Sequence, residues 1–222
     1  MDNLLKHYKP KNLSDRIALS FTKFLRFLAD TFFKKKYGHR AVVLETVAAV
    51  PGMVAGMLLH LKSLRKMQDD RGWIKTLLDE AANERMHLMT FIKIAKPTFI
   101  ERIIIMNAQF IFIIMYLFIY LISQKTAHRI VGYFEEEAVT SYTEYLEEIR
   151  EGKIEDIKAP EIAINYWNLP LNSKLSDVIE AIRDDEASHR DVNHSFADIL
   201  NNQKVQNVIN EEENKVKEKV NS

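Results

Sequence analysis

Two Glu-x-x-His tetrads constrain the fold of this chain more than any other feature of its sequence. They are residues 84–87 and 186–189, and both lie in segments whose apolar spacing is typical of helices. Residues three apart share a helix face, so each tetrad directs one carboxylate and one imidazole to a single point. The 19 Glu and 7 His of the 222 residues would give about 0.6 such tetrads by chance. One tetrad alone would mean little, but two predict helices that meet at a metal site.

The composition restricts both the number of domains and the metal ligands. With 222 residues, only 6 Gly and 5 Pro, the chain is expected to form one domain with few breaks. Cysteine is absent, which excludes disulfides, thiolate ligands and iron–sulfur clusters within this chain. Any metal must therefore be bound by oxygen and nitrogen. The first dozen residues show neither a secretory signal nor the pattern of a transit peptide.

Hydrophobic periodicity and helix boundary signals predict six helices and an all-α fold. We expect a single domain over residues 1–200, an irregular connection at 152–172 and a charged tail at 201–222. The predicted helices span residues 14–36, 40–67, 72–95, 97–124, 125–151 and 176–200.

Two segments favour attachment to a membrane surface. Residues 1–40 carry ten Lys and Arg against three Asp, interleaved with phenylalanines, a pattern that suits anionic lipid better than nucleic acid. Residues 103–122 contain no charge and are long enough to span a bilayer. Both neighbouring helices are acidic and are expected to lie against this segment, where each charge at the bilayer centre would cost roughly 3 kcal/mol. We therefore predict a monotopic protein whose helices 14–36 and 97–124 face lipid.

Unpaired glutamates supply the remaining candidate ligands. Glu45 is the only charged residue within 41–59, and a glutamate in such a run is rarely buried without a partner. A salt bridge to Arg40 or to another helix is the simpler alternative. Among three consecutive glutamates, Glu135 is preferred over the two that follow it because Tyr142 lies seven residues later on the same face.

The complete candidate set follows the ligand rule of di-iron carboxylate four-helix bundles, in which two helices give one Glu each and two give Glu-x-x-His. Four carboxylates balance the charge of two Fe(II) ions, and hard oxygen ligands with imidazoles suit iron. Zinc sites are typically four-coordinate and have no use for six ligands. The candidate ligands are Glu45, Glu84, His87, Glu135, Glu186 and His189.

Four segments carry a resemblance to a known family, namely residues 44–53, 83–88, 135–138 and 183–189. They resemble the signature segments of the alternative oxidases, which are cyanide-insensitive ubiquinol oxidases, and the resemblance covers about residues 15–200. It implies a homodimeric, ferritin-like four-helix bundle with two further helices that form a monotopic membrane face. It also implies two non-haem irons per chain, ubiquinol and O2 as substrates, and water as product without proton pumping. The implied location is the inner membrane of a mitochondrion or of an organelle derived from one.

The resemblance also implies roles for individual residues. Tyr142 would supply an electron or a proton during O–O cleavage, although an ordinary buried tyrosine is an equal alternative. Asn83, Asp185 and Trp167 would orient the ligands. The quinol channel would be lined by Arg26, Asp30, Arg40, Leu44, Phe134, Ala138 and Ser141.

This chain departs from the family pattern at a few positions. Phe134 stands where leucine is usual and Ser141 where threonine is usual, which bears on the fit of the quinol headgroup. The cysteine that confers thiol control on plant members is missing, so we expect that control to be absent.

Three other functions are compatible with parts of the pattern. A membrane-bound quinone-biosynthesis hydroxylase would use the same ligand rule, but the four segments favour the oxidase. An iron-storage bundle would have no use for the basic, Phe-rich first helix. A purely structural helical protein would bind no metal.

Overall fold

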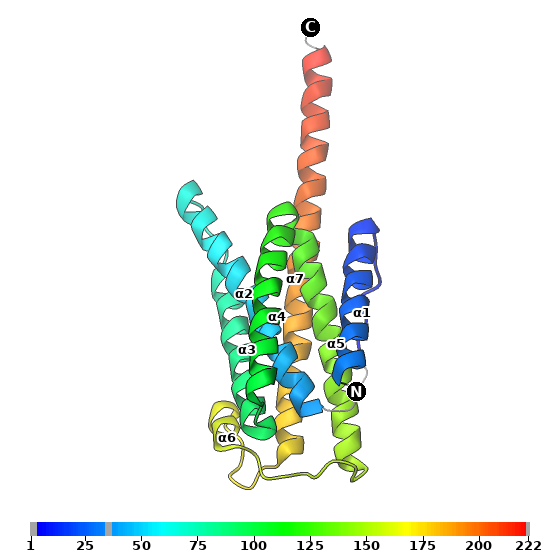
Figure 1. Ribbon diagram of the computed structural model, residues 1–222. Helices are drawn as coiled ribbons and strands as arrows, with labels where there is room; N and C mark the ends of the chain where they lie inside the picture. Colours follow the sequence, from blue (N-terminus) through cyan, green and yellow to red (C-terminus); the bar gives the residue numbers. More distant parts are fainter. Residues whose placement is uncertain (1–3, 34–36, 221–222) are drawn as a thin grey trace.

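The computed structural model describes residues 4–33 and 37–220. These residues form seven α-helices, which confirms the predicted all-α fold (Figure 1). The helices are α1 (Leu13–Phe33), α2 (Tyr37–Lys66), α3 (Trp73–Ala95), α4 (Phe99–Ile122), α5 (Gln124–Arg150), α6 (Glu161–Trp167) and α7 (Leu175–Val220).

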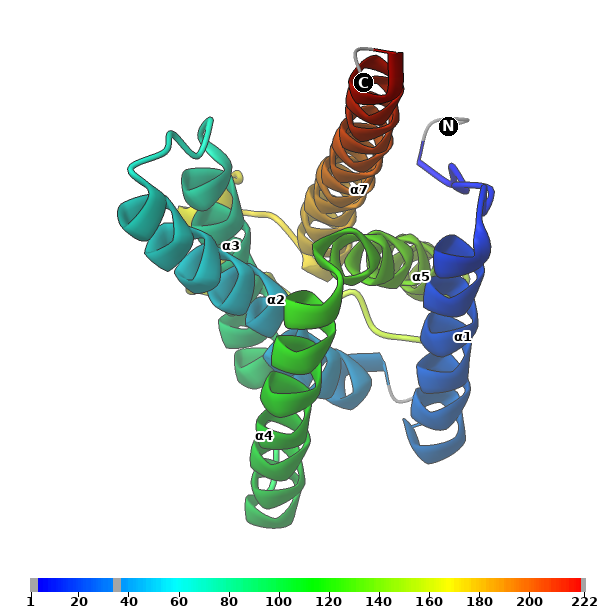
Figure 2. The same ribbon diagram turned by 90° about the horizontal axis from the view of Figure 1, so that it is seen from above.

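Four long helices make the bundle and two more lie against it. Helix α2 packs along α3 and α5 packs along α7, whereas α3 and α7 touch at only a few positions. Helix α1 lies against α5, and α4 lies against α2 and α5 (Figure 2). The predicted four-helix bundle with two additional helices is therefore confirmed.

Two segments contain more helix than the sequence indicated. The predicted irregular connection at 152–172 contains α6, which begins after Pro160 and ends at Asn168 in the left-handed conformation. Proline is tolerated at a helix start because its missing N–H would have no helical partner there. The predicted tail continues α7 as a helix to Val220, beyond the bundle (Figure 1). Residues 34–36, which the first predicted helix included, lie outside the described residues.

The packing partners of α4 also differ from the expected ones. We expected α4 to lie between α3 and α5, but within the described residues it packs against α2 and α5 instead. The cause is the turn before it: Lys96 adopts the left-handed conformation and Pro97 prevents α3 from continuing. Thr98 then starts α4 with a capping box formed with Glu101. This turn carries α4 across to α2.

Two glycines allow the helices of each pair to approach closely. A Cβ atom at Gly52 would overlap the carbonyl oxygen of Leu77, where α2 meets α3. A Cβ atom at Gly132 would overlap the imidazole of His194, where α5 meets α7. The candidate ligands lie on the inner faces of these two tightly packed pairs, so the pairs form rigid halves of the site.

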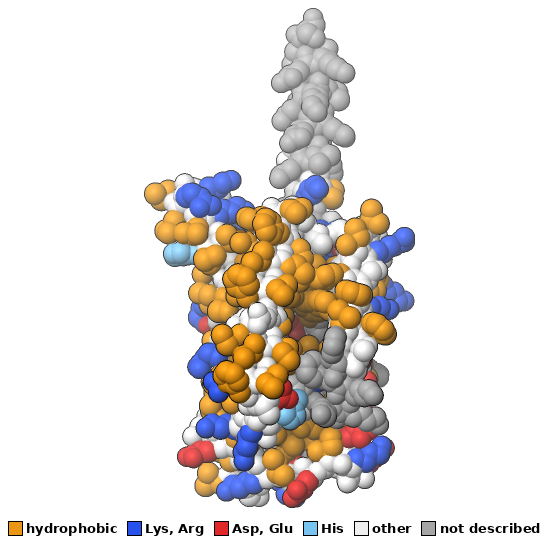
Figure 3. Space-filling model, in the orientation of Figure 1, with side chains coloured by type: hydrophobic (Ala, Val, Ile, Leu, Met, Phe, Trp, Pro, Cys, Tyr) orange, Lys and Arg blue, Asp and Glu red, His pale blue; other side chains and the backbone are white. Residues whose placement is uncertain are grey.

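The outer surface carries a continuous apolar face. Large apolar side chains of α4 are exposed along its whole length, among them Phe99, Ile103, Phe110, Phe118 and Ile122. The space-filling view shows these hydrophobic side chains gathered over α4 and extending toward α1 (Figure 3). Helices α2 and α4 are both long and apolar enough to cross a bilayer, but 56% of the apolar window of α2 is buried in the protein against 22% for α4. Of these two helices, α4 is the one that presents most of its apolar surface outward.

Candidate metal centre

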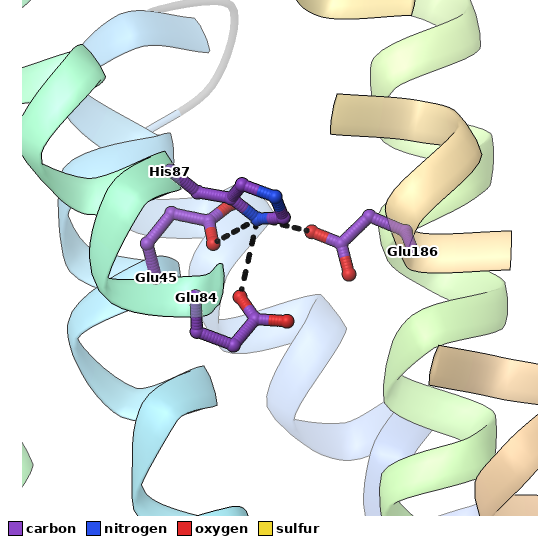
Figure 4. Close-up of side chains that lie close together, drawn as sticks. All are labelled: Glu45, Glu84, His87 and Glu186. Carbon is purple, nitrogen blue, oxygen red and sulfur yellow. Dashed lines mark ion pairs between the residues drawn. The ribbon is translucent and has the colours of Figure 1, made fainter. Parts of the chain in front are cut away.

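Four predicted ligands point toward one another in the middle of the bundle (Figure 4). Nδ1 of His87 lies 3.4 Å from Oε2 of Glu45, 3.3 Å from Oε2 of Glu84 and 3.3 Å from Oε1 of Glu186. One ligand atom from each of the four lies within 4.8 Å of the others. The residues come from α2, α3 and α7, so they converge only because the bundle forms.

The structure brings the other two predicted ligands to the same cluster. Nδ1 of His189 lies 2.7 Å from Oε1 of Glu84, and Glu135 shares a hydrogen bond with Glu186. The two glutamates after Glu135 point elsewhere. Glu136 pairs with His194 at 2.9 Å, and Glu137 accepts from Arg26 at 2.7 Å. Of the three consecutive glutamates, only Glu135 therefore faces the centre.

The polar atoms of the cluster are buried and largely without hydrogen-bond partners. All six residues are at most 9% exposed. Both carboxylate oxygens of Glu84, one each of Glu45 and Glu186, and Nδ1 of both histidines accept or donate no hydrogen bond. Buried polar atoms in folded proteins are nearly always satisfied, and isolated unpaired ones are costly. Orphaned oxygen and nitrogen atoms that converge from three helices fit a site that binds metal ions.

The charges of the cluster favour a cation as well. Burial, together with the carboxylates of Glu186 and Glu84, raises the pKa of Glu45 and of Glu135 well above its ordinary value. Burial would also raise the pKa of Glu84, but the two histidines lower it well below. Burial lowers the pKa of His87, yet the neighbouring carboxylates raise it well above 6.5. Divalent cations would remove the repulsion between the carboxylates and would replace the protons that burial favours.

The predicted orienting residues meet at one carboxylate oxygen. Oδ2 of Asp185 accepts from Nδ2 of Asn83 at 2.9 Å and from Nε1 of Trp167 at 2.8 Å. The same oxygen lies 3.2 Å from Nε2 of His87. This contact holds one imidazole proton on Nε2, so that a metal would displace the proton on Nδ1 and bind there, an arrangement common around metal-bound histidines. The short helix α6 ends at Trp167 and so places this indole beside Asp185.

The sequence reasoning missed a polar pair beside the centre. Glu80 is 5% exposed, and Nδ2 of Asn193 donates to both of its oxygens, at 3.0 and 2.9 Å. Burial raises the pKa of Glu80 to about 7. A signal for this pair was present in the sequence, since Glu80 lies one turn before Glu84 and Asn193 one turn after His189.

A cavity of about 680 Å³ leads from α1 and α4 to the centre. At its inner end it reaches Glu45 and Tyr142, whose hydroxyl donates a hydrogen bond to Oε1 of Glu45. Asp30 does not line the cavity, but it pairs with Arg26 at 3.1 Å and with Arg40 at 2.7 Å. The predicted quinol residues that do line it are Arg26, Arg40, Leu44, Phe134, Ala138 and Ser141.

The fold and the site together define a class of protein: four-helix bundles whose carboxylates and imidazoles converge on a buried centre suited to metal ions. The sequence model of the family described as "Alternative oxidase" matches residues 2–198 of this chain. The chain belongs to the alternative oxidase family, as the resemblance of its four segments predicted.

Plant relatives show how close the similarity is. The chain is 57% identical over 197 residues to "Ubiquinol oxidase 2, mitochondrial" of Glycine max. The aligned region covers 89% of this chain and 59% of the relative. It is 56% identical over 199 residues to "Ubiquinol oxidase 2, mitochondrial" of Arabidopsis thaliana. Here the aligned region covers 90% of this chain and 56% of the relative. The chain thus spans less than two thirds of the length of these relatives.

Proposed function

We propose that this protein is a ubiquinol oxidase that reduces O2 to water. Membership of the alternative oxidase family supports this activity, as do the relatives named ubiquinol oxidase. The quinone-biosynthesis hydroxylase considered above shares the ligand rule, but the family match favours the oxidase. The cavity that connects the apolar helices to the buried cluster is the observation that carries the proposal.

We propose two non-haem irons per chain as the metal. Their supporting argument is charge: two Fe(II) ions balance four carboxylates, and two imidazoles complete a set of ligands suited to iron. When bound, the irons would supply the redox chemistry, taking electrons from quinol and delivering them to O2. The residues proposed to bind them are Glu45, Glu84, His87, Glu135, Glu186 and His189.

The cavity suits a quinol with an apolar tail. Its lining is mostly apolar, and it lies between α1 and α4, the two helices proposed to face lipid. Arg40 is 4% exposed, and its buried Nε has no hydrogen-bond partner. A quinol oxygen would satisfy this donor. The neighbouring Asp30 fixes the guanidinium through the contact at 2.7 Å.

The reaction balances with the protons of quinol alone. Two quinols give four electrons and four protons, and one O2 uses all of them to form two waters. Tyr142 and Glu45 lie at the inner end of the cavity and share a hydrogen bond, so they are placed to pass a quinol proton toward the centre. The net reaction therefore takes up no proton from solvent, and we propose that it is not coupled to proton pumping.

We further propose monotopic attachment to the mitochondrial inner membrane and a homodimer. The exposed apolar side chains of α4 and of α1, including Phe24 and Phe27, support a face that enters one leaflet. The printed names of the relatives place them in mitochondria. A separate strip on α2 and α3 exposes Met53, Met57, Leu61, Leu64 and Leu78, and we assign it to a second copy.

The experiment that tests this function measures O2 consumption by the purified protein with a ubiquinol analogue, in the presence of cyanide. We expect two quinols oxidised for each O2 consumed and no accumulation of hydrogen peroxide. A ratio of one quinol per O2 with stoichiometric peroxide would contradict reduction to water.

A further inference from the structure

Two successive side-chain contacts join α3 to α7, and we call each of them a rung. The first rung is the contact of 2.7 Å between Oε1 of Glu84 and Nδ1 of His189. One turn earlier on α3 and one turn later on α7, Nδ2 of Asn193 donates to both oxygens of Glu80. The helices run antiparallel, so the two rungs follow each other directly along the interface.

These rungs matter because the site is divided between two tightly packed helix pairs. Helices α3 and α7 touch at few positions, while each packs closely along its own partner. Helix α4 joins the halves on one side, where it packs against α2 and α5, and on the other side their separation is set where α3 meets α7. The halves are Glu45, Glu84 and His87 on α2 and α3, and Glu135, Glu186 and His189 on α5 and α7.

Two contacts between α3 and α7 join no pair of ligands. Asp185 of α7 accepts from Asn83 of α3 at 2.9 Å, between residues adjacent in sequence to Glu186 and Glu84. On the side away from α6, the Glu80–Asn193 rung lies one turn beyond the ligands. The ligand rung joins two groups that would both bind metal, so metal binding would replace this contact and it cannot fix the separation in both states. The Glu80–Asn193 rung is independent of the metal.

A third helix fixes the orientation of Asn193. Nδ1 of His128 on α5 lies 3.0 Å from Oδ1 of Asn193. Burial lowers the pKa of His128 to about 4, so the ring is neutral and Nδ1 carries the donated proton. Nδ2 of Asn193 is then left to face Glu80 and the carbonyl oxygen of His189, 3.0 Å away. The reversed amide would set its oxygen against both oxygens of Glu80, which offer no donor when the carboxylate is ionised.

We propose that Glu80 and Asn193 are positioning residues that hold the two halves of the centre at the separation that metal binding requires. They touch neither the metal nor the substrate. They act through Glu84, one turn away on the same helix as Glu80, and through the backbone of His189. The effect on metal rests on the metal centre proposed above, whereas the effect on helix separation does not.

The first experiment measures the separation of α3 and α7 in the metal-free, full-length protein. The chain contains no cysteine, so cysteines introduced at the exposed positions Ala82 and Ser188 can be spin-labelled selectively. Glu80→Leu fills a similar volume but offers Asn193 no acceptor, and we expect a broader or longer spin–spin distance distribution. Glu80→Gln, the matched control, keeps an oxygen acceptor and should give the distribution of the unsubstituted protein. Identical distributions for all three would overturn the proposal.

The second experiment titrates the same variants with Fe(II) under anaerobic conditions. We expect Glu80→Leu to lower the affinity at least tenfold, as loss of an outer hydrogen-bond partner typically does, and Glu80→Gln to change it less than threefold. A purely structural role predicts lower thermal stability with unchanged Fe(II) affinity, and that result would also overturn the proposal. Failure of the parent protein to bind Fe(II) would contradict the proposed metal centre. The distance measurement would still show whether the Glu80–Asn193 rung sets the separation of α3 and α7.

Asn193→Leu breaks the same rung from the other side and serves if Glu80→Leu does not fold. The double variant Glu80→Leu, Asn193→Leu should lose no more affinity than either single variant, because both remove one contact. Additive losses would mean that the two residues act independently, which contradicts the proposal.

Discussion

The hydroxyl of Tyr142 on α5 donates a hydrogen bond to Oε1 of Glu45 on α2. Both side chains are buried, and the tyrosine ring stacks on Phe91 with centroids 5.8 Å apart. Burial, reinforced by the Glu45 carboxylate, raises the pKa of Tyr142 well above 10. The phenol therefore keeps its proton at neutral pH and links the inner end of the cavity to a proposed ligand.

Tyr142→Phe separates the chemistry of this contact from its packing. The ring remains, so we expect iron content and thermal stability close to those of the parent protein. Quinol oxidase activity should fall at least tenfold, about 1.4 kcal/mol of transition-state stabilisation. Tyr145→Phe is the matched control, because Tyr145 is also buried on α5 but stacks on Tyr37. Near-parental turnover of Tyr142→Phe would make Tyr142 an ordinary core residue.

Arg40→Gln tests the cavity as the quinol site. The substitution removes the buried Nε donor and the contact with Asp30, which is partly exposed and can be hydrated instead. We expect kcat/KM for quinol to fall at least tenfold, about 1.4 kcal/mol, with unchanged iron content. Steady-state kinetics at several quinol concentrations measure kcat/KM. Lys62→Gln, at a partly exposed position of α2 that does not line the cavity, is the control, and equal kinetics for both variants would exclude the cavity as the binding site.

His128 makes the metal-free fold sensitive to acid. Its pKa falls from 6.5 in the unfolded chain to about 4 when buried, so between these values only the unfolded chain takes up the proton. The stability linked to this group is complete above pH 6.5 and is lost as the pH falls toward 4, by at most about 3 kcal/mol. His128→Asn keeps a donor for Asn193 but does not titrate. Denaturant unfolding measures the free energy of unfolding of the variant and of the parent. As the pH is lowered from 7 to 4, we expect the variant to lose less stability than the parent. A difference between the two that stays constant over this range would refute the role of His128.

Monotopic attachment can be tested by labelling. Cysteines introduced at Gln68 and Leu171 place one thiol in the α2–α3 connection and one in the connection before α7. In vesicles with protein inserted from one side, we expect an impermeant thiol reagent to modify both. Modification of only one, with the other reached after lysis, would show that the chain crosses the bilayer.

Helical periodicity was sufficient to predict the bundle, because long amphipathic segments with few Gly and Pro leave little choice of secondary structure. The tetrads also fix which face of α3 and of α7 turns inward. The choice of Glu135 among three consecutive glutamates rested on weak spacing, and the structure supplies a clear physical distinction: its neighbours pair with His194 and Arg26.

Other features depend on tertiary contacts that no local pattern encodes. The path of α4 follows from the left-handed residue Lys96, and lysine gives no sign of that conformation. Helix α6 is only seven residues long, too short for a periodic signal. The spacing places Glu80 on the same helix face as Glu84, but its pairing with Asn193, which His128 orients, depends on the contact between α3 and α7.

The central claim is that six converging side chains bind two irons that carry out quinol-dependent O2 reduction. Elemental analysis of the purified active protein, alongside Glu84→Ala and the exposed control Glu147→Ala, tests it most directly. We predict two irons per chain in the parent and the control, and loss of iron and activity together in Glu84→Ala. Active protein that contains stoichiometric zinc and no iron, or Glu84→Ala that keeps both iron and activity, would contradict the account.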